Sequence, residues 1–202
     1  MAVVLKSSQE IEKMRRAGQI VREVLELVRS KVRPGATTYD LEKAAAARLN
    51  ELGVKAAFKG YHGYPCVLCT SVNSEVVHGI PSPKRVLKEG DIVSVDFGVV
   101  VDGYYGDAAI TVPVGSIDAN AARLLKATEE SLKAGIAAVK PGATLGDVGA
   151  GAELWRSGPG HEAESGHGHR HRAHGECRQA GCAGAGRRLD RSGQRWKHER
   201  SF

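Results

Sequence analysis

The chain has 202 residues, 42% of them hydrophobic and 26% charged, and a formal net charge of +6. This length suffices for one domain, and the absence of any run of about 18 apolar residues excludes a transmembrane helix. The first residues, MAVVLKSSQE, lack the long apolar run of a signal peptide. In a chain without an export signal, cysteines are usually reduced thiols. We therefore expect a cytoplasmic protein with no membrane partner.

Composition divides the chain into two unlike parts. Residues 1–149 contain 19 basic and 17 acidic residues and have the apolar content of an ordinary globular domain. Residues 150–202 contain ten basic and six acidic residues, no Val or Ile, and only Leu154 and Leu189 as leucines. Such a segment buries too little apolar surface to offset the entropy of ordering, so we expect a disordered tail. Because the basic excess lies mainly there, it does not indicate a nucleic-acid partner.

Two helices are expected at the start of the domain. Ser7 and Glu10 have the spacing of a capping box, and apolar residues at helical spacing follow until Pro34-Gly35 ends the pattern. A second amphipathic segment covers residues 38–52 and is closed by Gly53.

Strand-like apolar runs follow the two helices. They are expected at residues 54–58, 66–72 and 75–78. A proline-rich loop at 80–84 then leads into a longer pair of runs at 90–112. A third helix begins near Asp118 and ends before Pro141-Gly142. Helices combined with antiparallel strands indicate the α+β fold class.

The segment GDIVSVDFGVVVDGYYGDAAITV (residues 90–112) has the pattern of a β-hairpin. Asp102-Gly103 between two apolar runs is typical of a two-residue type I′ turn, whose central residues both need positive φ. Counting outward from this turn predicts the opposed pairs Val101 with Tyr104, Phe97 with Ala108, and Gly98 with Asp107.

Two aspartates fall on one face of this hairpin. Asp96 is two residues from Gly98, so it is a diagonal neighbour of Asp107, about 7–8 Å away between Cα atoms. Adjacent like charges among apolar residues destabilise a sheet, and a divalent cation bound by the carboxylate oxygens would remove this repulsion. One interpretation is therefore a metal site. The other is a solvated sheet face that carries two unrelated acids.

Two further patterns could bind metal ions. The spacing Cys66-x-x-Cys69 suits half of a zinc site or a redox pair, but it lies in the apolar run CVLCTSV, where packing is the favoured role. The histidines of the tail have the composition of a metal-binding tract, although a changed reading frame accounts for them better.

An internal repeat supports such a change of frame. VRPGATTYDL (residues 32–41) and VKPGATLGDV (139–148) each follow an amphipathic helix, 107 residues apart. We interpret them as two copies of one unit, of which the second breaks off after Gly149. Displacing plausible codons by one nucleotide converts residues 158–174 into the apolar, strand-like text GPGMKLKAGMVIAIEPM. The shifted text suits a β-rich continuation better than the sequence as it stands.

Several motifs together resemble the type I methionine aminopeptidases, which have the two-fold pita-bread metallopeptidase fold. They are IEKMRRAG (11–18), FKGYHGYPCVLCTSVNSEVVHGIP (58–81), the hairpin segment (90–112) and PGATLGDVG (141–149), in the family's order and spacing. The resemblance implies a pita-bread fold whose second half is incomplete here. It also implies removal of the N-terminal methionine from nascent proteins, with the ribosome as a candidate partner.

The resemblance implies roles for single residues as well. Asp96 and Asp107 match two of the family's five metal ligands, and two divalent ions (Co, Mn, Fe, Zn or Ni) are the implied cofactors. His78, in EVVHGIP, matches the histidine that contacts the substrate. The positions that match the pocket for the methionine side chain are Tyr61, Tyr64 and Cys69.

The family's other three ligands, one histidine and two glutamates, have no counterpart in the sequence as it stands. From this departure we infer that a deletion near residues 149–150 removed an internal segment and shifted the frame. We therefore expect weak or partial metal binding, an exposed half-core and negligible peptide hydrolysis by this chain. Two alternatives stay open. One is a non-catalytic remnant that binds peptides or the ribosome, and the other is a related proline-specific exopeptidase.

Overall fold

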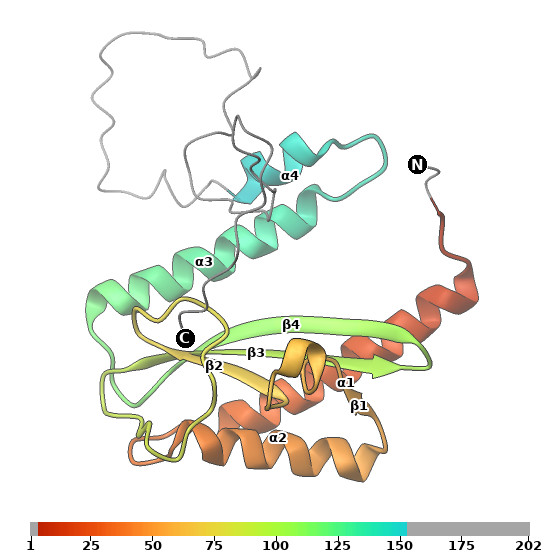
Figure 1. Cartoon of the computed structure of the whole chain (residues 1–202). Coiled ribbons are helices and arrows are strands. Elements are labelled where there is room, and N and C mark those ends of the chain that lie inside the picture. The colour runs from red at the N-terminus through yellow and green to blue at the C-terminus, as the bar shows by residue number, and fades with distance from the viewer. Residues whose placement is uncertain (1–3, 153–202) are drawn as a thin grey trace, which may run out of the picture. The chain divides into compact units, whose positions relative to one another are not determined.

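The computed structural model describes residues 4–152. In chain order, the elements of this part are α1 (Ser8–Lys31), α2 (Thr38–Leu52), β1 (Lys55–Ala56), the short 3₁₀ turn η1 (Tyr61–Gly63), β2 (Leu68–Val72), β3 (Ile92–Val101), β4 (Tyr104–Pro113), α3 (Ala119–Ala138) and α4 (Leu145–Ala152) (Figure 1). Helices and antiparallel strands together confirm the predicted α+β class. Within residues 4–152, no helix combines the length and the apolar character needed to cross a membrane.

Strand β3 lies at the centre of a four-stranded antiparallel sheet. It pairs with β4 along its whole length on one side, and with β2 and β1 on the other. The two turn residues of the β3–β4 hairpin have positive φ, 49° at Asp102 and 82° at Gly103, as a type I′ turn requires. The observed register confirms the predicted pairs Val101 with Tyr104, Phe97 with Ala108, and Gly98 with Asp107.

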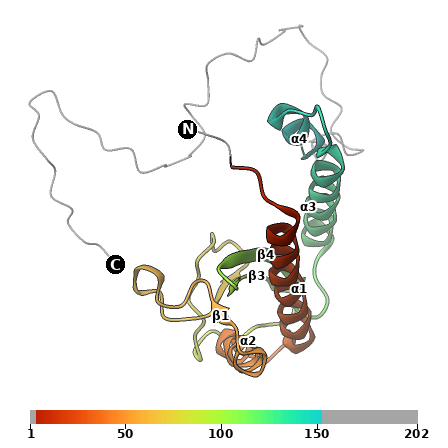
Figure 2. The same cartoon turned by 90° about the vertical axis from the view of Figure 1, so that its right-hand side faces the viewer.

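Helix α1 covers one face of the sheet, and the segment that follows β1 and contains η1 lies on the side away from α1 (Figure 2). The predicted capping box is present: the Ser7 hydroxyl accepts a hydrogen bond from the Glu10 amide, and the Glu10 carboxylate accepts one from the Ser7 amide. Helix and sheet are so close that a Cβ atom on Gly106 would lie 2.7 Å from the carbonyl carbon of Ala17. The core between them includes the fully buried side chains Val21, Val24, Val28, Val93, Val95, Phe97 and Val99.

The Glu10 carboxylate should make the stability of the folded protein depend on pH. It accepts hydrogen bonds from the Ser7 amide (2.7 Å), the Ser7 hydroxyl (2.9 Å) and the Tyr104 hydroxyl (2.9 Å). The bonds from Ser7 are the main reason that its pKa falls from 4.5 to about 2. A carboxyl group whose pKa is lower in the folded state adds stability above its unfolded pKa, and this stability is lost as the pH falls through the folded value.

Glu10→Gln should therefore weaken the pH dependence of stability between pH 4.5 and about 2. Urea unfolding midpoints at several pH values across this window measure the effect. Glu12→Gln is the matched control, because Glu12 lies in the same helix and pairs at the surface with Arg15. An acid dependence that Glu10→Gln leaves unchanged would contradict the role assigned to this carboxylate.

Both PGAT motifs build the same local structure. Gly35 and Gly142 follow the prolines with φ of 85° and 86°, a conformation that favours glycine. Reciprocal side-chain bonds then cap the next helix, between Thr37 and Asp40 at α2 and between Thr144 and Asp147 at α4. The two-fold repeat predicted from the sequence is therefore also a repeat of backbone geometry.

The helices that precede the two motifs differ in burial. The offset of 107 residues places Leu124 and Leu132 of α3 at the positions of Ala17 and Leu25 of α1. Ala17 and Leu25 are 0% and 4% exposed, whereas Leu124 and Leu132 are 57% and 61% exposed. Within residues 4–152, the apolar face of α3 is thus largely uncovered, as an incomplete second half of the repeat implies.

The predicted strands before the hairpin need correction. The run at 54–58 forms only the two-residue β1, and the run at 66–72 forms a strand only from Leu68 onward. Residues 75–78 form no strand, because a turn after β2 reverses the chain: Asn73 has φ 58°, and the Glu75 amide donates to the Val72 carbonyl. Val76 and Val77 are consequently exposed rather than packed in a sheet.

The end of the described part lies in α4. This helix continues through the predicted boundary at residues 149–150 to Ala152. The chain divides into two units, Met1–Gly158 and Pro159–Phe202, and the second lies wholly outside the described residues. The predicted disorder of residues 150–202 and their histidine tract also lie outside, apart from the last turn of α4.

Strand β4 has one free edge among the described residues. The Val114 amide donates to the Asp91 carbonyl (2.8 Å), and alternation from this pair directs every second residue of β4 toward β3. The backbone groups of the intervening residues therefore point outward, where no described strand pairs with them. These residues are Tyr105, Asp107, Ala109 and Thr111.

Candidate metal and substrate site

Asp96 and Asp107 lie on the sheet face opposite α1. Asp96 is paired with Ala109, and Asp107 is paired with Gly98, so the two aspartates are diagonal neighbours on adjacent strands. Asp96 is half-buried and Asp107 is exposed. Burial, followed by the nearby charge of Asp107, raises the pKa of Asp96. The predicted placement of both carboxylates on one face is confirmed by this register.

The residues around the pair form a polar strip on this face. Cys69 of β2 is directly opposite Asp96, and Ser71 is opposite Ser94. The Ser94 hydroxyl lies 2.9 Å from the Thr111 hydroxyl across the next strand pair. Hydroxyl groups and carboxylates on three adjacent strands make this the part of the sheet suited to hard cations or polar ligands.

The sequence analysis did not identify Phe58, although its ring lies beside the two aspartates. A Cβ atom on Gly98 would be 2.9 Å from the Cε1 atom of Phe58 and 3.0 Å from the Cβ atom of Ala57. Gly98 thus lets Ala57 and the Phe58 ring approach β3 closely, and the Ala57 amide donates to the Gly98 carbonyl (2.9 Å). A glycine inside a Val-rich strand often marks such a close approach and was the available signal.

His78 lies in the loop between β2 and β3, next to the aspartates. The next residue, Gly79, is hydrogen-bonded to Thr70 and Ser71 of β2, and Cys69 of the same strand is opposite Asp96. The φ of His78 (65°) lies in the left-handed region, which residues other than glycine adopt rarely. Strained backbone of this kind is concentrated at functional sites. The structure thus places the loop that carries His78 beside β2, the strand next to Asp96.

The three candidate pocket residues differ in how far their side chains are buried. Tyr64 is half-buried, and Cys69 is buried beside it. Tyr61 is 69% exposed and contacts His62 edge to face, with ring centroids 4.3 Å apart. The structure therefore places Cys69 opposite Asp96, with Tyr64 beside Cys69, and leaves the Tyr61 side chain at the surface.

Cys66 and Cys69 are both free and buried. Burial raises the pKa of both thiols, which keeps them protonated, whereas a metal ligand or redox nucleophile must be a thiolate. Their environment favours packing over a zinc or redox role.

Glu42 is a second residue that the sequence analysis missed. Its carboxylate is buried in α2 and accepts hydrogen bonds from the amides of Val67 (2.8 Å) and Leu68 (3.0 Å). These bonds fix the start of β2, one residue before Cys69, relative to the helix. A glutamate on the apolar face of α2, next to Leu41 and three residues before Ala45, was the available signal.

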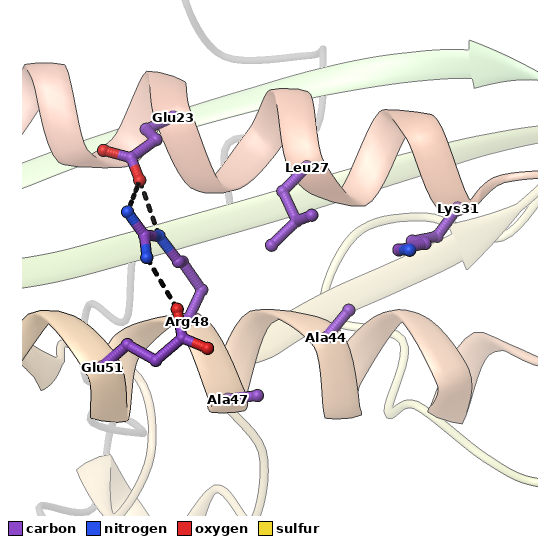
Figure 3. Close-up of a pocket in the computed structure, with 7 residues that line it drawn as sticks. All are labelled: Glu23, Leu27, Lys31, Ala44, Ala47, Arg48 and Glu51. Carbon is purple, nitrogen blue, oxygen red and sulfur yellow. Dashed lines mark hydrogen bonds and ion pairs between the residues drawn. The ribbon is translucent and has the colours of Figure 1, made fainter.

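A cavity between the first two helices lies away from this site. A cavity of about 430 Å³ lies between α1 and α2 and is lined by Leu27, Lys31, Ala44 and Ala47 (Figure 3). At one end, Arg48 bridges Glu23 and Glu51, with nitrogen–oxygen distances of 2.6 Å. None of the candidate metal or substrate residues lines this cavity.

The donor set fits a divalent cation, but incompletely. Two carboxylates on one sheet face supply hard oxygen ligands. In the described part of the chain, no group of three or more His, Cys, Asp or Glu residues is arranged to hold a metal ion. Asp96 and Asp107 therefore form a two-ligand site that a complete metal centre would have to supplement.

Comparison with known proteins identifies the family. The model of metallopeptidase family M24 matches residues 12–191. The chain is 49% identical over 154 residues to a methionine aminopeptidase of Aquifex aeolicus, covering 73% of this chain and 60% of that relative.

Solved structures agree with this match. The methionine aminopeptidase of Thermotoga maritima has a TM-score of 0.74 and 46% identity, and the likeness covers 77% of this chain and 63% of that one. An aminopeptidase P of Escherichia coli has a TM-score of 0.62 and 26% identity, covering 73% of this chain and 32% of that one. These neighbours confirm the pita-bread fold. The chain spans about 60% of the length of the curated relatives it matches, and it belongs to metallopeptidase family M24.

Proposed function

We propose that this chain carries part of a methionine aminopeptidase, a metallopeptidase that removes the N-terminal methionine of nascent proteins in the cytoplasm. The observation that carries the proposal is the pair Asp96 and Asp107 on one sheet face, with His78 beside it. Identity of 49% to the Aquifex aeolicus methionine aminopeptidase, against 26% to aminopeptidase P, supports methionine over proline specificity. The ribosome, where nascent chains emerge, is the partner proposed for the whole protein.

Each site residue has a proposed role. Asp96 and Asp107 hold a divalent cation (Co, Mn, Fe, Zn or Ni), which when bound supplies an activated water and a Lewis acid for the scissile carbonyl. His78 donates a hydrogen bond to the peptide and steadies charge that develops next to the leaving amide. Tyr64 and Cys69 form the inner wall of an apolar pocket for the methionine side chain, with Tyr61 at its rim.

The chain alone is proposed to bind metal weakly and to have negligible turnover. Two carboxylates leave most of the coordination sphere of a divalent cation to water, so the nucleophile is poorly positioned. The two-ligand site also supports the alternative of a non-catalytic peptide- or ribosome-binding remnant. The likeness to aminopeptidase P keeps a proline-specific exopeptidase as the second enzymatic alternative.

Titration with Mn²⁺, followed by calorimetry or by the electron spin resonance of free Mn²⁺, tests the metal role. Asp107→Asn should weaken Mn²⁺ binding by about tenfold or more, because it removes one of two hard ligands. Mn²⁺ is the appropriate probe because it prefers carboxylates to the imidazoles of the tail.

The matched control is Asp102→Asn, on the same hairpin. Asp102 occupies the turn at φ 49°, where asparagine is equally well accommodated, so the fold should not change. Equal Mn²⁺ affinity for the wild-type chain and Asp107→Asn would contradict the proposed site. An equal loss of affinity in Asp102→Asn would show a general charge effect instead.

A further inference from the structure

We propose that Tyr64 is a positioning residue, whose hydroxyl group ties β2 to the loop that carries His78 and so sets where the imidazole lies relative to Asp96. This inference rests on the proposed function, because it gives His78 a task at the site. It adds to the pocket role of the Tyr64 ring a separate role for its hydroxyl group.

The hydroxyl group of Tyr64 joins two backbone segments that are separate in the sequence. It lies 2.8 Å from the carbonyl oxygen of Leu68, at the start of β2, and 3.2 Å from the carbonyl oxygen of Gly79. Both partners are acceptors, so the single O–H hydrogen is shared between them. Burial is the main reason that the pKa of Tyr64 is raised, and the hydroxyl group therefore stays protonated and able to donate.

Gly79 is the residue through which this bond acts on His78. Its carbonyl also accepts a hydrogen bond from the Thr70 amide (2.8 Å), and its own amide donates to the Ser71 hydroxyl (3.3 Å). Gly79 lies so close to β2 that an added Cβ atom would be 2.1 Å from the Thr70 carbonyl oxygen. The residue directly after His78 is thus held against the sheet by three hydrogen bonds.

This anchorage maintains the unusual backbone of His78. A φ of 65° is unfavourable for a residue with a Cβ atom, so contacts outside the residue must hold it there. The residues before His78 offer little support, because Val76 and Val77 are 85% and 60% exposed. The bonds to Gly79 therefore carry most of the constraint on the backbone of His78, from which the imidazole projects.

Hydrogen bonds of the Tyr64 backbone also stabilise the turn that follows Phe58. The Tyr64 carbonyl accepts a hydrogen bond from the Gly60 amide (2.8 Å), and the Tyr64 amide donates to the Tyr61 carbonyl (2.9 Å). These bonds close the turn that follows Phe58, whose ring lies on Gly98. Tyr64 thus connects the turn after Phe58, through its backbone, with the loop that carries His78, through its hydroxyl group.

Nuclear magnetic resonance of the full chain tests this role with Tyr64→Phe, which keeps the ring and removes only the hydroxyl group. We expect the Thr70 amide, which shares the Gly79 acceptor, to exchange with solvent about tenfold faster. The backbone order parameter of His78 should fall, while amides of the β3–β4 ladder keep wild-type protection. The matched control is Tyr61→Phe, because the Tyr61 side chain is 69% exposed and its hydroxyl group is not part of the anchorage of Gly79.

Broadening of the resonance signals by Mn²⁺ then shows whether a failure concerns the positioning role of Tyr64 or the proposed metal site. Bound at the aspartates, Mn²⁺ should broaden the signals of both Asp107 and His78 in the wild-type chain. In Tyr64→Phe, broadening should persist at Asp107 and weaken at His78. Absence of broadening in the wild-type chain would contradict the metal site and leave the exchange result as the test of the tie. Unchanged Thr70 exchange and His78 order in Tyr64→Phe, or equally faster exchange throughout the sheet, would overturn the proposal.

Discussion

The 202-residue chain is expected to release no measurable methionine from a Met-Ala peptide, even with excess Mn²⁺ or Co²⁺. Asp96 and Asp107 supply two carboxylates, and among residues 4–152 no third His, Cys, Asp or Glu residue is arranged to hold a metal ion with them. A water nucleophile on a cation held by two ligands is neither well positioned nor shielded from solvent. The uncovered apolar face of α3 should further lower the stability of the isolated chain.

A chimera shows whether the described half-site is competent. Residues 1–149 can be continued with the corresponding segment of the Aquifex aeolicus methionine aminopeptidase, which is 49% identical over the shared part. This protein should hydrolyse Met-Ala, and Asp107→Asn in it should lower kcat/KM by more than about 100-fold, since a metal ligand is lost. An Xaa-Pro peptide, tested in parallel, separates the methionine-specific from the proline-specific reading.

Two outcomes would contradict this account. Robust activity of the 202-residue chain that is lost in Asp107→Asn would show that its own residues complete the site. An inactive chimera that nevertheless folds and binds Mn²⁺ would favour the non-catalytic alternative. Asp102→Asn again serves as the matched control in both proteins and should leave turnover unchanged.

The second large effect concerns the free energy of unfolding. Replacing glycine by alanine should lower it at Gly106 and raise it at Gly18. Gly106→Ala places a Cβ atom 2.7 Å and 2.8 Å from the carbonyl carbon and oxygen of Ala17. These are backbone atoms of α1, so the helix must move away from β4. The cost of such overpacking is about 1–3 kcal/mol.

Gly18→Ala is the matched variant. Gly18 is an exposed residue inside α1, and a Cβ atom there would have no other atom within 4 Å. Alanine should therefore stabilise the helix by about 0.5–1 kcal/mol. Urea unfolding monitored by circular dichroism measures both variants against the wild-type chain. A stability gain in Gly106→Ala, or a loss of similar size in both variants, would contradict the close packing of α1 on β4.

Local signals account for the parts of the fold that could be predicted. The capping residues located both N-terminal helices, and the two-residue turn at Asp102-Gly103 determined the register of the whole hairpin. Since the side-chain period of a strand is two, this register also placed both aspartates on one face. A few residues with strict conformational demands were sufficient for this half of the site.

Long-range contacts account for what could not be predicted. The Val-Val pair before His78 has strand character, but the turn at Asn73 and the anchorage of Gly79 on Thr70 exclude a strand. The contact of Phe58 with Gly98 joins residues 40 positions apart. Glu42 binds amides 25 and 26 residues away. Such pairings follow from the packed structure and have no local pattern beyond an unusual glycine or a misplaced charge.

The outward amides of β4 affect how the protein behaves in concentrated solution. Ala108 and Ala109 are small and exposed, so they give this edge little steric protection against a strand from another molecule. The charge of Asp107 is then the main obstacle to edge-to-edge pairing, because two copies of the edge repel each other through it. Neutralisation of Asp107, by a bound cation or by substitution, removes this repulsion and promotes aggregation. The carboxylate that is proposed to bind the metal therefore also keeps copies of the chain apart in concentrated solution.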